Sequence, residues 1–229
     1  MKALSLPQAG ERDSAWLAGA EFAVVVALFV ADFNHHIYVS KTPYLFLLGW
    51  LSLRWRRLGW RGVGLARPVN WPKTIAIGVA CGIGLELLEL FVTQPVLVRV
   101  FHKIPDFSDL GELHGNRQLV LLYITLAWTL AAFGEEMVYR GYLMNRVAGL
   151  FRDPKVAWAV SLIVVSFAFG LGHIDQGITG QTENMINGLL LGVIFLATGC
   201  NLWAAIIAHG LGDTIDLVLL YLGKYPMRR

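Results

Sequence analysis

The sequence predicts an all-α integral membrane protein, a polytopic bundle of about seven or eight transmembrane helices. Hydrophobic residues make up 56% of the 229 positions and charged residues only 15%, whereas soluble domains carry about 25% charged residues. The mean hydropathy is +0.57. The apolar residues also occur in long runs, and a run of about 20 residues is enough to cross a bilayer core.

Seven apolar segments follow one another along the chain. They cover residues 15–33, 43–53, 71–92, 119–133, 156–171, 185–198 and 202–222. The stretch 135–150 is helical too, and it either continues the fourth segment or forms an eighth helix. The first segment is longer than a signal-peptide core and has no clear cleavage site, so we expect it to be retained. With no repeat or long linker, residues 1–229 are predicted to form one integral membrane domain.

The basic residues indicate the orientation of this domain. The loop 54–73 contains five arginines and one lysine but no acid, which predicts that it faces the cytoplasm. The connection 146–155 falls on the same side if residues 119–150 cross the membrane once. We expect a multi-pass protein of the bacterial plasma membrane. A net charge of only +3, placed beside apolar segments, points to membrane lipid as a partner and not to nucleic acid.

Ionisable residues at bilayer depth are the first candidates for function, because each costs at least about 2.5–3.5 kcal/mol to insert. Glu136 and Arg140 are spaced i, i+4, so they can pair and brace the helix. Glu135 is rotated by about 100° from Glu136 and lies outside that pair. It is therefore the candidate general base. A purely structural ion-pair cluster is the alternative interpretation of this group.

Two histidines on other apolar segments extend the candidate site. His209 and Asp213 share one face at i, i+4, and Asp216 continues that face at i+7. A lone histidine in an apolar helix is typically a satisfied core residue, but a second one, His173, lies on a separate segment. Two imidazoles and a free carboxylate can activate water and stabilise an oxyanion, as amide hydrolysis requires.

The three groups, Glu135-Glu136-x-x-x-Arg140, Phe169-x-x-x-His173 and His209-x-x-x-Asp213, occur in the order and spacing of a known motif set. They resemble the CAAX prenyl endopeptidase and bacteriocin-processing family of intramembrane proteins, also called the CPBP or Abi family. The resemblance covers residues 119–217. It implies an all-helical core, no cofactor or catalytic metal, and cleavage of a peptide or protein by glutamate-activated water.

The same resemblance implies a role for each site residue. Glu135 would be the base, His173 would hold or polarise the water, and His209 and Asp213 would face the oxyanion. The family often has Asn where this chain has Asp213. An ionised aspartate would repel an oxyanion, so Asp213 must be neutral or must orient His209. The implied substrate is a peptide or protein, lipidated or not, that reaches the site from the lipid or the cytoplasm.

Other functions remain open at this stage. The chain could be a non-catalytic membrane scaffold or an immunity-type protein that uses the motif residues for binding. A zinc-dependent protease with Glu135, His173 and His209 as ligands is another alternative, although the sequence lacks HExxH. A proton-relaying transporter is less favoured, because no inverted repeat is visible.

Two further acids lie outside every motif. Glu86 and Glu89 are spaced i, i+3 in the third apolar segment, so they could face a cavity or pair with an arginine. For these two residues a structural or gating role is the favoured interpretation.

Overall fold

The computed structural model describes residues 5–7, 10, 13–37 and 40–226, and seven continuous helical bodies account for most of them. Short 3-10 turns lie in the connections: η1 (Trp60–Val63), η3 (Ser108–Leu113) and η5 (Ile174–Gln176). The seven bodies are α1 (Ala15–Phe33), α2 (Thr42–Trp55), α3 (Trp71–Leu88) with η2 (Glu89–Thr93) and α4 (Gln94–Phe101), α5 (Arg117–Leu126) with η4 (Ala127–Met144) and α6 (Asn145–Ala148), α7 (Pro154–Leu171), α8 (Gly177–Ala197) and α9 (Leu202–Tyr221). The predicted all-α class is confirmed for the described residues.

Among the described residues, five of these bodies are long and apolar enough to cross a membrane, so the chain is a multi-pass membrane protein. They are Ala15–Phe33, Trp71–Phe101, Arg117–Ala148, Pro154–Leu171 and Leu202–Tyr221. The helix α2 has only 14 residues, below the usual range of about 17–25. The first half of α8 is polar, with Gln181, Glu183, Asn184 and Asn187. The stretch 135–150 is not a separate helix, because it continues the fourth body to Ala148.

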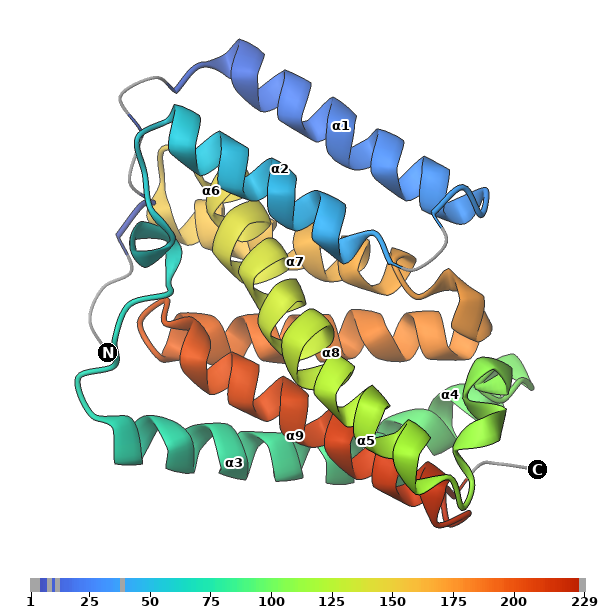
Figure 1. Ribbon diagram of the computed structural model, residues 1–229. Coiled ribbons are helices and arrows are strands. Elements are labelled where there is room, and N and C mark those ends of the chain that lie inside the picture. The colour runs from blue at the N-terminus through green and yellow to red at the C-terminus, as the bar shows by residue number, and fades with distance from the viewer. Residues whose placement is uncertain (1–4, 8–9, 11–12, 38–39, 227–229) are drawn as a thin grey trace.

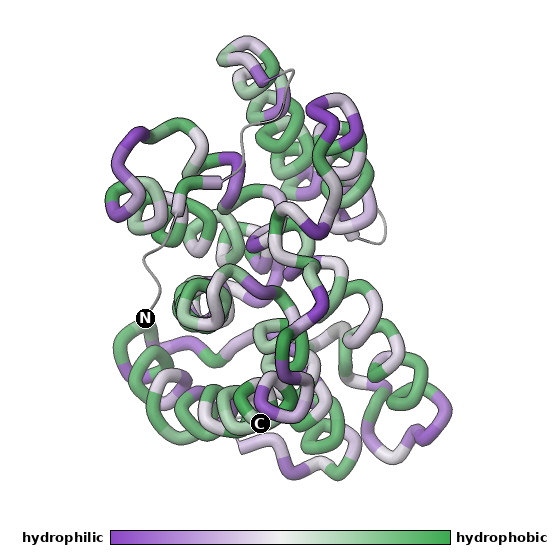
Figure 2. Tube along the Cα trace, turned by 90° about the vertical axis from the view of Figure 1, so that its left-hand side faces the viewer, coloured by the Kyte–Doolittle hydropathy of each residue, from purple (hydrophilic) through white to green (hydrophobic). Residues whose placement is uncertain are grey.

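The surface of the bundle is apolar and several buried positions are polar, the reverse of a soluble protein. On α7, Ile163 is 63% exposed and Phe167 is 55% exposed, while Ser161 and Ser166 are buried. Figure 2 shows hydrophobic stretches along the helices and hydrophilic stretches chiefly in the connections. This arrangement suits contact with lipid on the outside and a polar site within.

The connections gather at two opposite ends of the bundle. At the first end the Leu202 amide donates to the Gly64 carbonyl (3.0 Å), and the Asn145 side chain donates to the Val63 carbonyl (3.4 Å). At the second end the Gly115 amide donates to the Tyr221 carbonyl (3.0 Å). The basic connections 54–73 and 146–155 therefore lie together at the first end, on the left in Figure 1.

Small residues bring α3 against α9 and so position the acids of both helices. A Cβ atom added to Gly78 would lie 2.6 Å from the Ile207 Cβ, and one added to Gly82 would lie 2.8 Å from the Ala208 carbonyl oxygen. Such contacts let helix backbones approach closely in membranes. Glu86 follows Gly82 by one turn and therefore faces the part of α9 that carries the motif residues.

The central element is the helix Arg117–Ala148, which crosses diagonally in front of the bundle in Figure 1. Its middle part, η4, is wound as a π-helix, a form that often occurs at functional sites. Residues 136–144 are all buried. The motif residues of this helix therefore lie among the other helices and away from lipid.

Candidate active site

The Glu136–Arg140 pair predicted from the i, i+4 spacing is present. The Arg140 Nη1 atom lies 2.8 Å from Glu136 Oε1, and both side chains are almost completely buried. Arg140 Nη2 also donates to the Gly188 carbonyl (2.8 Å). The guanidinium lies over the Phe169 ring, 4.7 Å from its centre. Arg140 thus connects η4 to both α8 and α7.

Glu136 also holds His209, a contact that the sequence analysis did not predict. The His209 Nδ1 atom lies 3.0 Å from Glu136 Oε1, and its Nε2 atom lies 3.7 Å from Asp213 Oδ1. A carboxylate that is paired with a guanidinium is an acceptor, so Nδ1 of His209 carries the hydrogen. The Nε2 atom is then the one that faces Asp213 and the cavity.

His173 lies two residues beyond the end of α7, and its ring is fixed by that helix. The Nδ1 atom lies 2.8 Å from the Phe169 carbonyl oxygen. A carbonyl oxygen can only accept, so Nδ1 is the donor and Nε2 of the neutral ring is a free acceptor. Lys41 donates to the Gly172 carbonyl (2.7 Å) and pairs with Asp32 (2.7 Å). These contacts tie the backbone beside His173 to α1 and to the start of α2.

Glu135 points away from the pair formed by its neighbour, as the helical spacing predicted. Its carboxylate Oε1 accepts a hydrogen bond from Thr42 Oγ1 at 3.3 Å. Thr42 is the first residue of α2 and is buried. No sequence signal identified Thr42 or Lys41, because their partners lie about 90 or more positions away in the chain.

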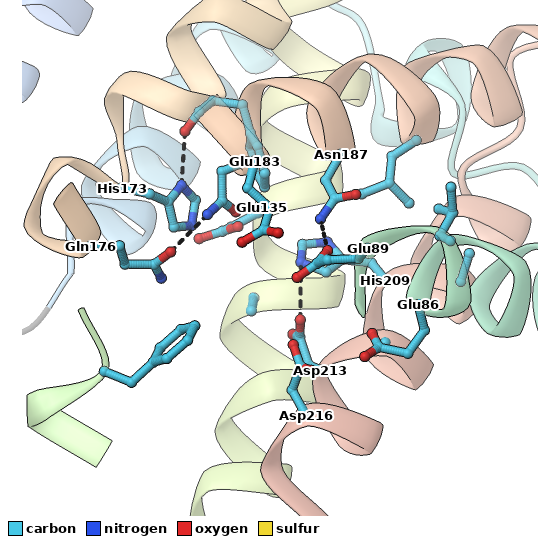
Figure 3. A pocket seen from close by; sticks show the side chains of 18 residues that line it. Glu86, Glu89, Glu135, His173, Gln176, Glu183, Asn187, His209, Asp213 and Asp216 are labelled. Carbon is cyan, nitrogen blue, oxygen red and sulfur yellow. Dashed lines mark hydrogen bonds and ion pairs between the residues drawn. The ribbon is translucent and has the colours of Figure 1, made fainter. Parts of the chain in front are cut away.

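Glu135, His173, His209 and Asp213 line one internal cavity of about 170 Å³. One water molecule needs only about 10–15 Å³ of such volume, so the cavity has room for several. Figure 3 shows these side chains directed into it from different helices. The structure thus brings together all four residues that were predicted as catalytic, whereas Glu136 and Arg140 lie behind them.

Four more carboxylates line the same cavity: Glu86, Glu89, Glu183 and Asp216. The i, i+3 spacing of Glu86 and Glu89 allows them either to face a cavity or to pair with an arginine, and both line the cavity. Glu183 was not singled out, because it lies in the polar half of α8 and in no motif.

A zinc site would need at least three His, Cys, Asp or Glu side chains close enough to bind one metal ion. Within the part of the chain that the structure describes, no three His, Cys, Asp or Glu side chains are grouped so that they could hold a metal ion. Glu135, His173 and His209 surround the cavity, but they are not arranged as a ligand set.

A second hollow of about 320 Å³ adjoins the cavity and shares Glu135, Asp213 and Asp216 with it. We call this hollow the apolar groove. Most of its other lining residues are apolar, among them Leu126, Leu130, Leu217, Leu220 and Tyr123. It lies toward the second end of the bundle, between η3, the first half of the helix Arg117–Ala148 and the end of α9.

The fold and the site together define a multi-pass membrane protein with a carboxylate and two imidazoles around an internal cavity. Residues 117–215 match the family described as Type II CAAX prenyl endopeptidase Rce1-like, so the chain carries a domain of this family. The resemblance inferred from the motifs is confirmed, with bounds two residues earlier than expected at each end. No curated protein and no solved structure matches the chain.

Proposed function

We propose that the chain is an intramembrane endopeptidase that hydrolyses a peptide bond with a water molecule activated by Glu135. The observation that carries this proposal is the convergence of Glu135, His173 and His209 on one cavity. Each of the three is held by a contact of its own, to Thr42, to the Phe169 carbonyl and to Glu136 respectively. Such preorganisation is what a hydrolytic site needs.

In the proposed first step, Glu135 accepts a proton from a water that also donates to Nε2 of His173. The oxygen of this water attacks the carbonyl carbon, and the C=O bond becomes a C–O⁻ oxyanion. In the second step the C–N bond breaks, and Glu135 returns its proton to the leaving nitrogen. The products are a carboxyl group and an amine, and Glu135 is again a carboxylate.

His209 is the proposed donor to the oxyanion of this intermediate. With Nδ1 donating to Glu136, a protonated ring directs its second N–H, on Nε2, toward the cavity. Asp213 lies 3.7 Å from that atom, longer than a hydrogen bond. We infer that Asp213 is neutral or orients His209, because an ionised carboxylate touching the oxyanion would repel it.

The apolar groove is the proposed path for the substrate, a peptide or protein that can be lipidated. It lies toward the end of the bundle opposite the basic connections 54–73 and 146–155. Since basic loops face the cytoplasm, entry from the lipid and the outer side is favoured over entry from the cytoplasm. We further propose that α2 and α8 complete a set of seven membrane helices in the bacterial plasma membrane.

A cleavage assay tests the proposal. The protein is purified in detergent and incubated with a peptide library, with Glu135→Gln and the exposed Glu112→Gln compared beside it. We expect Glu135→Gln to lower turnover by about 10²–10⁴-fold and Glu112→Gln to leave it unchanged. If Glu135→Gln cleaves as well as the wild type, Glu135 is not the base and the proposal fails. If the wild type cleaves no peptide, the proposal fails in favour of a non-catalytic membrane protein that uses the site for binding.

A further inference from the structure

A third hollow, of about 500 Å³, lies at the first end of the bundle, and none of its described lining residues lines the cavity of the candidate active site. It lies where the basic connection 54–73 meets the first residues of α3 and α9, on the left in Figure 1. We call it the basic hollow. The side chains that line it are Trp60, Arg61, Leu65, Arg67, Trp71 and Trp203. Two cations and three large aromatic rings thus surround one space.

The walls of the basic hollow are fixed by contacts within the chain. The Asn201 side chain donates to the Ala66 carbonyl (2.9 Å), so the basic connection is attached to the start of α9 directly beside Arg67. The rings of Trp71 and Trp203 meet edge to face, with their centres 5.1 Å apart, and join the start of α3 to the start of α9. The hollow is therefore preformed, as a binding site usually is.

None of the described residues neutralises the two arginines of the basic hollow. Arg61 and Arg67 are both exposed, and neither forms an ion pair with another residue that the structure describes. The connection 54–73 that carries them contains no acid. A guanidinium presents five N–H donors in a plane and can bind a phosphate group in bidentate fashion. The charge of the hollow is therefore complementary to a phosphate group.

An apolar ridge of α3 continues from the hollow along the outside of the bundle. It begins at Trp71 and contains Ile75, Val79 and Ile83, which are all exposed. Residues four apart lie on one side of a helix, and the twelve residues from Trp71 to Ile83 span about 18 Å. Half of a bilayer core is about 15 Å thick. The hollow and the ridge together suit a molecule with an anionic head and a hydrocarbon chain.

We propose that the basic hollow binds one anionic phospholipid of the membrane leaflet at the first end of the bundle. Its phosphate lies between Arg61 and Arg67, and one acyl chain follows the ridge of α3. The three tryptophans then lie at the level of the headgroup, where such rings gather in membrane proteins. An acidic protein segment is a weaker match, because the ridge offers no hydrogen-bond partner to a peptide backbone. The site does not depend on the proposed peptidase activity.

Lipid titration of the detergent-purified protein tests the site. Two phospholipids with the same acyl chains are compared, the anionic phosphatidylglycerol and the zwitterionic phosphatidylcholine. We expect phosphatidylglycerol to raise Tm by about 5–10 °C at about 100 times its Kd, and one molecule to stay bound in native mass spectrometry. Phosphatidylcholine should do neither. No rise in Tm, or the same rise with both lipids, would overturn the site.

A pair of double variants separates the basic hollow from the general attraction of basic loops for anionic lipid. Arg61→Gln/Arg67→Gln should weaken phosphatidylglycerol binding by about 10–100-fold. The control Arg152→Gln/Lys155→Gln removes the same charge from the other basic connection, where both residues are exposed, and should bind as the wild type does. Equal weakening in both double variants would overturn the site. If Arg61→Gln/Arg67→Gln does not fold, the single variant Arg67→Gln replaces it.

Two probes without acyl chains identify the source of the anion. Glycerol phosphate carries a phosphate ester alone, and hexaglutamate carries the charge of an acidic protein segment. Neither should raise Tm at the concentration at which phosphatidylglycerol does, because neither can cover the ridge of α3. An equal rise with glycerol phosphate would indicate a site for a free phosphate ester, and an equal rise with hexaglutamate would indicate a surface for an acidic protein. Either result would overturn the lipid site.

Discussion

Replacing Arg140 by alanine should destabilise the whole bundle, whereas replacing its near neighbour Glu135 should not. Arg140 is 1% exposed and makes three contacts, to Glu136, to the Gly188 carbonyl and to the Phe169 ring. The alanine variant leaves the Glu136 carboxylate buried without its guanidinium and the Gly188 carbonyl without its side-chain donor. Glu135 accepts a hydrogen bond from Thr42 at 3.3 Å and lines a cavity large enough for water.

The loss can be estimated from these contacts. Breaking a buried ion pair by removing one partner costs about 3–5 kcal/mol. For a chain of this length each kcal/mol lowers Tm by about 2–4 °C, so Arg140→Ala should unfold about 6–20 °C below the wild type. Glu135→Ala should unfold within about 2 °C of the wild type, because it removes no buried charge pair. Thermal unfolding of the three detergent-purified proteins, followed by tryptophan fluorescence, measures both values. If Arg140→Ala and Glu135→Ala have the same Tm, the structural role assigned to Arg140 and withheld from Glu135 is refuted.

Four further outcomes are expected. Asp213→Asn should keep activity within about tenfold of the wild type, since asparagine can replace a neutral or orienting aspartate; loss of activity that zinc restores in a chelated sample would revive the zinc alternative. Thr42→Val should lower kcat by about 2–10-fold through loss of the hydrogen bond to Glu135, and Thr42→Ser should restore it. Gly82→Leu should lower Tm by overpacking against Ala208, at a cost of about 1–3 kcal/mol, whereas Gly84→Leu should not, because a Cβ atom added at Gly84 meets nothing within 4 Å. Partial burial raises the pKa of Asp13, but the hydrogen bond and charge of Arg146 and the charge of Arg56 outweigh it and hold that pKa below 3.8. Its stabilisation is therefore full above that value and lost as the pH falls further, so Asp13→Asn should flatten the acid limb of Tm against pH.

Contacts between residues close in sequence were predictable, because helical geometry alone determines them. The Glu136–Arg140 pair, the shared face of His209 and Asp213 and the separate direction of Glu135 all followed from spacing. The number of long apolar membrane spans did not, because α2 is short and the first half of α8 is polar, so five of the seven helical bodies qualify among the described residues. In the first half of α8, Glu183 accepts a hydrogen bond from Gln94, which lies 89 positions away in the chain.

The contacts that complete the site join residues that lie far apart in the sequence. Thr42 reaches Glu135 and Lys41 reaches the backbone beside His173 only when α2 is packed on η4. Periodicity within one segment cannot indicate such a pairing, since it describes one helix at a time. The π-helical winding of η4 was equally hidden, because it depends on hydrogen bonding within the folded helix and leaves no residue pattern that we recognised.

Glu136 contacts both its structural partner Arg140 and a residue of the candidate site, His209. Its Oε1 atom accepts from Arg140 at 2.8 Å and from His209 at 3.0 Å, so one oxygen joins the helix that carries the proposed base to the helix that carries the proposed oxyanion donor. Removing the charge at Glu136 would release Arg140 and His209 together. The two adjacent glutamates therefore differ in direction: Glu135 faces the cavity, which has room for water, and Glu136 faces Arg140 and His209, which connect it to the surrounding helices.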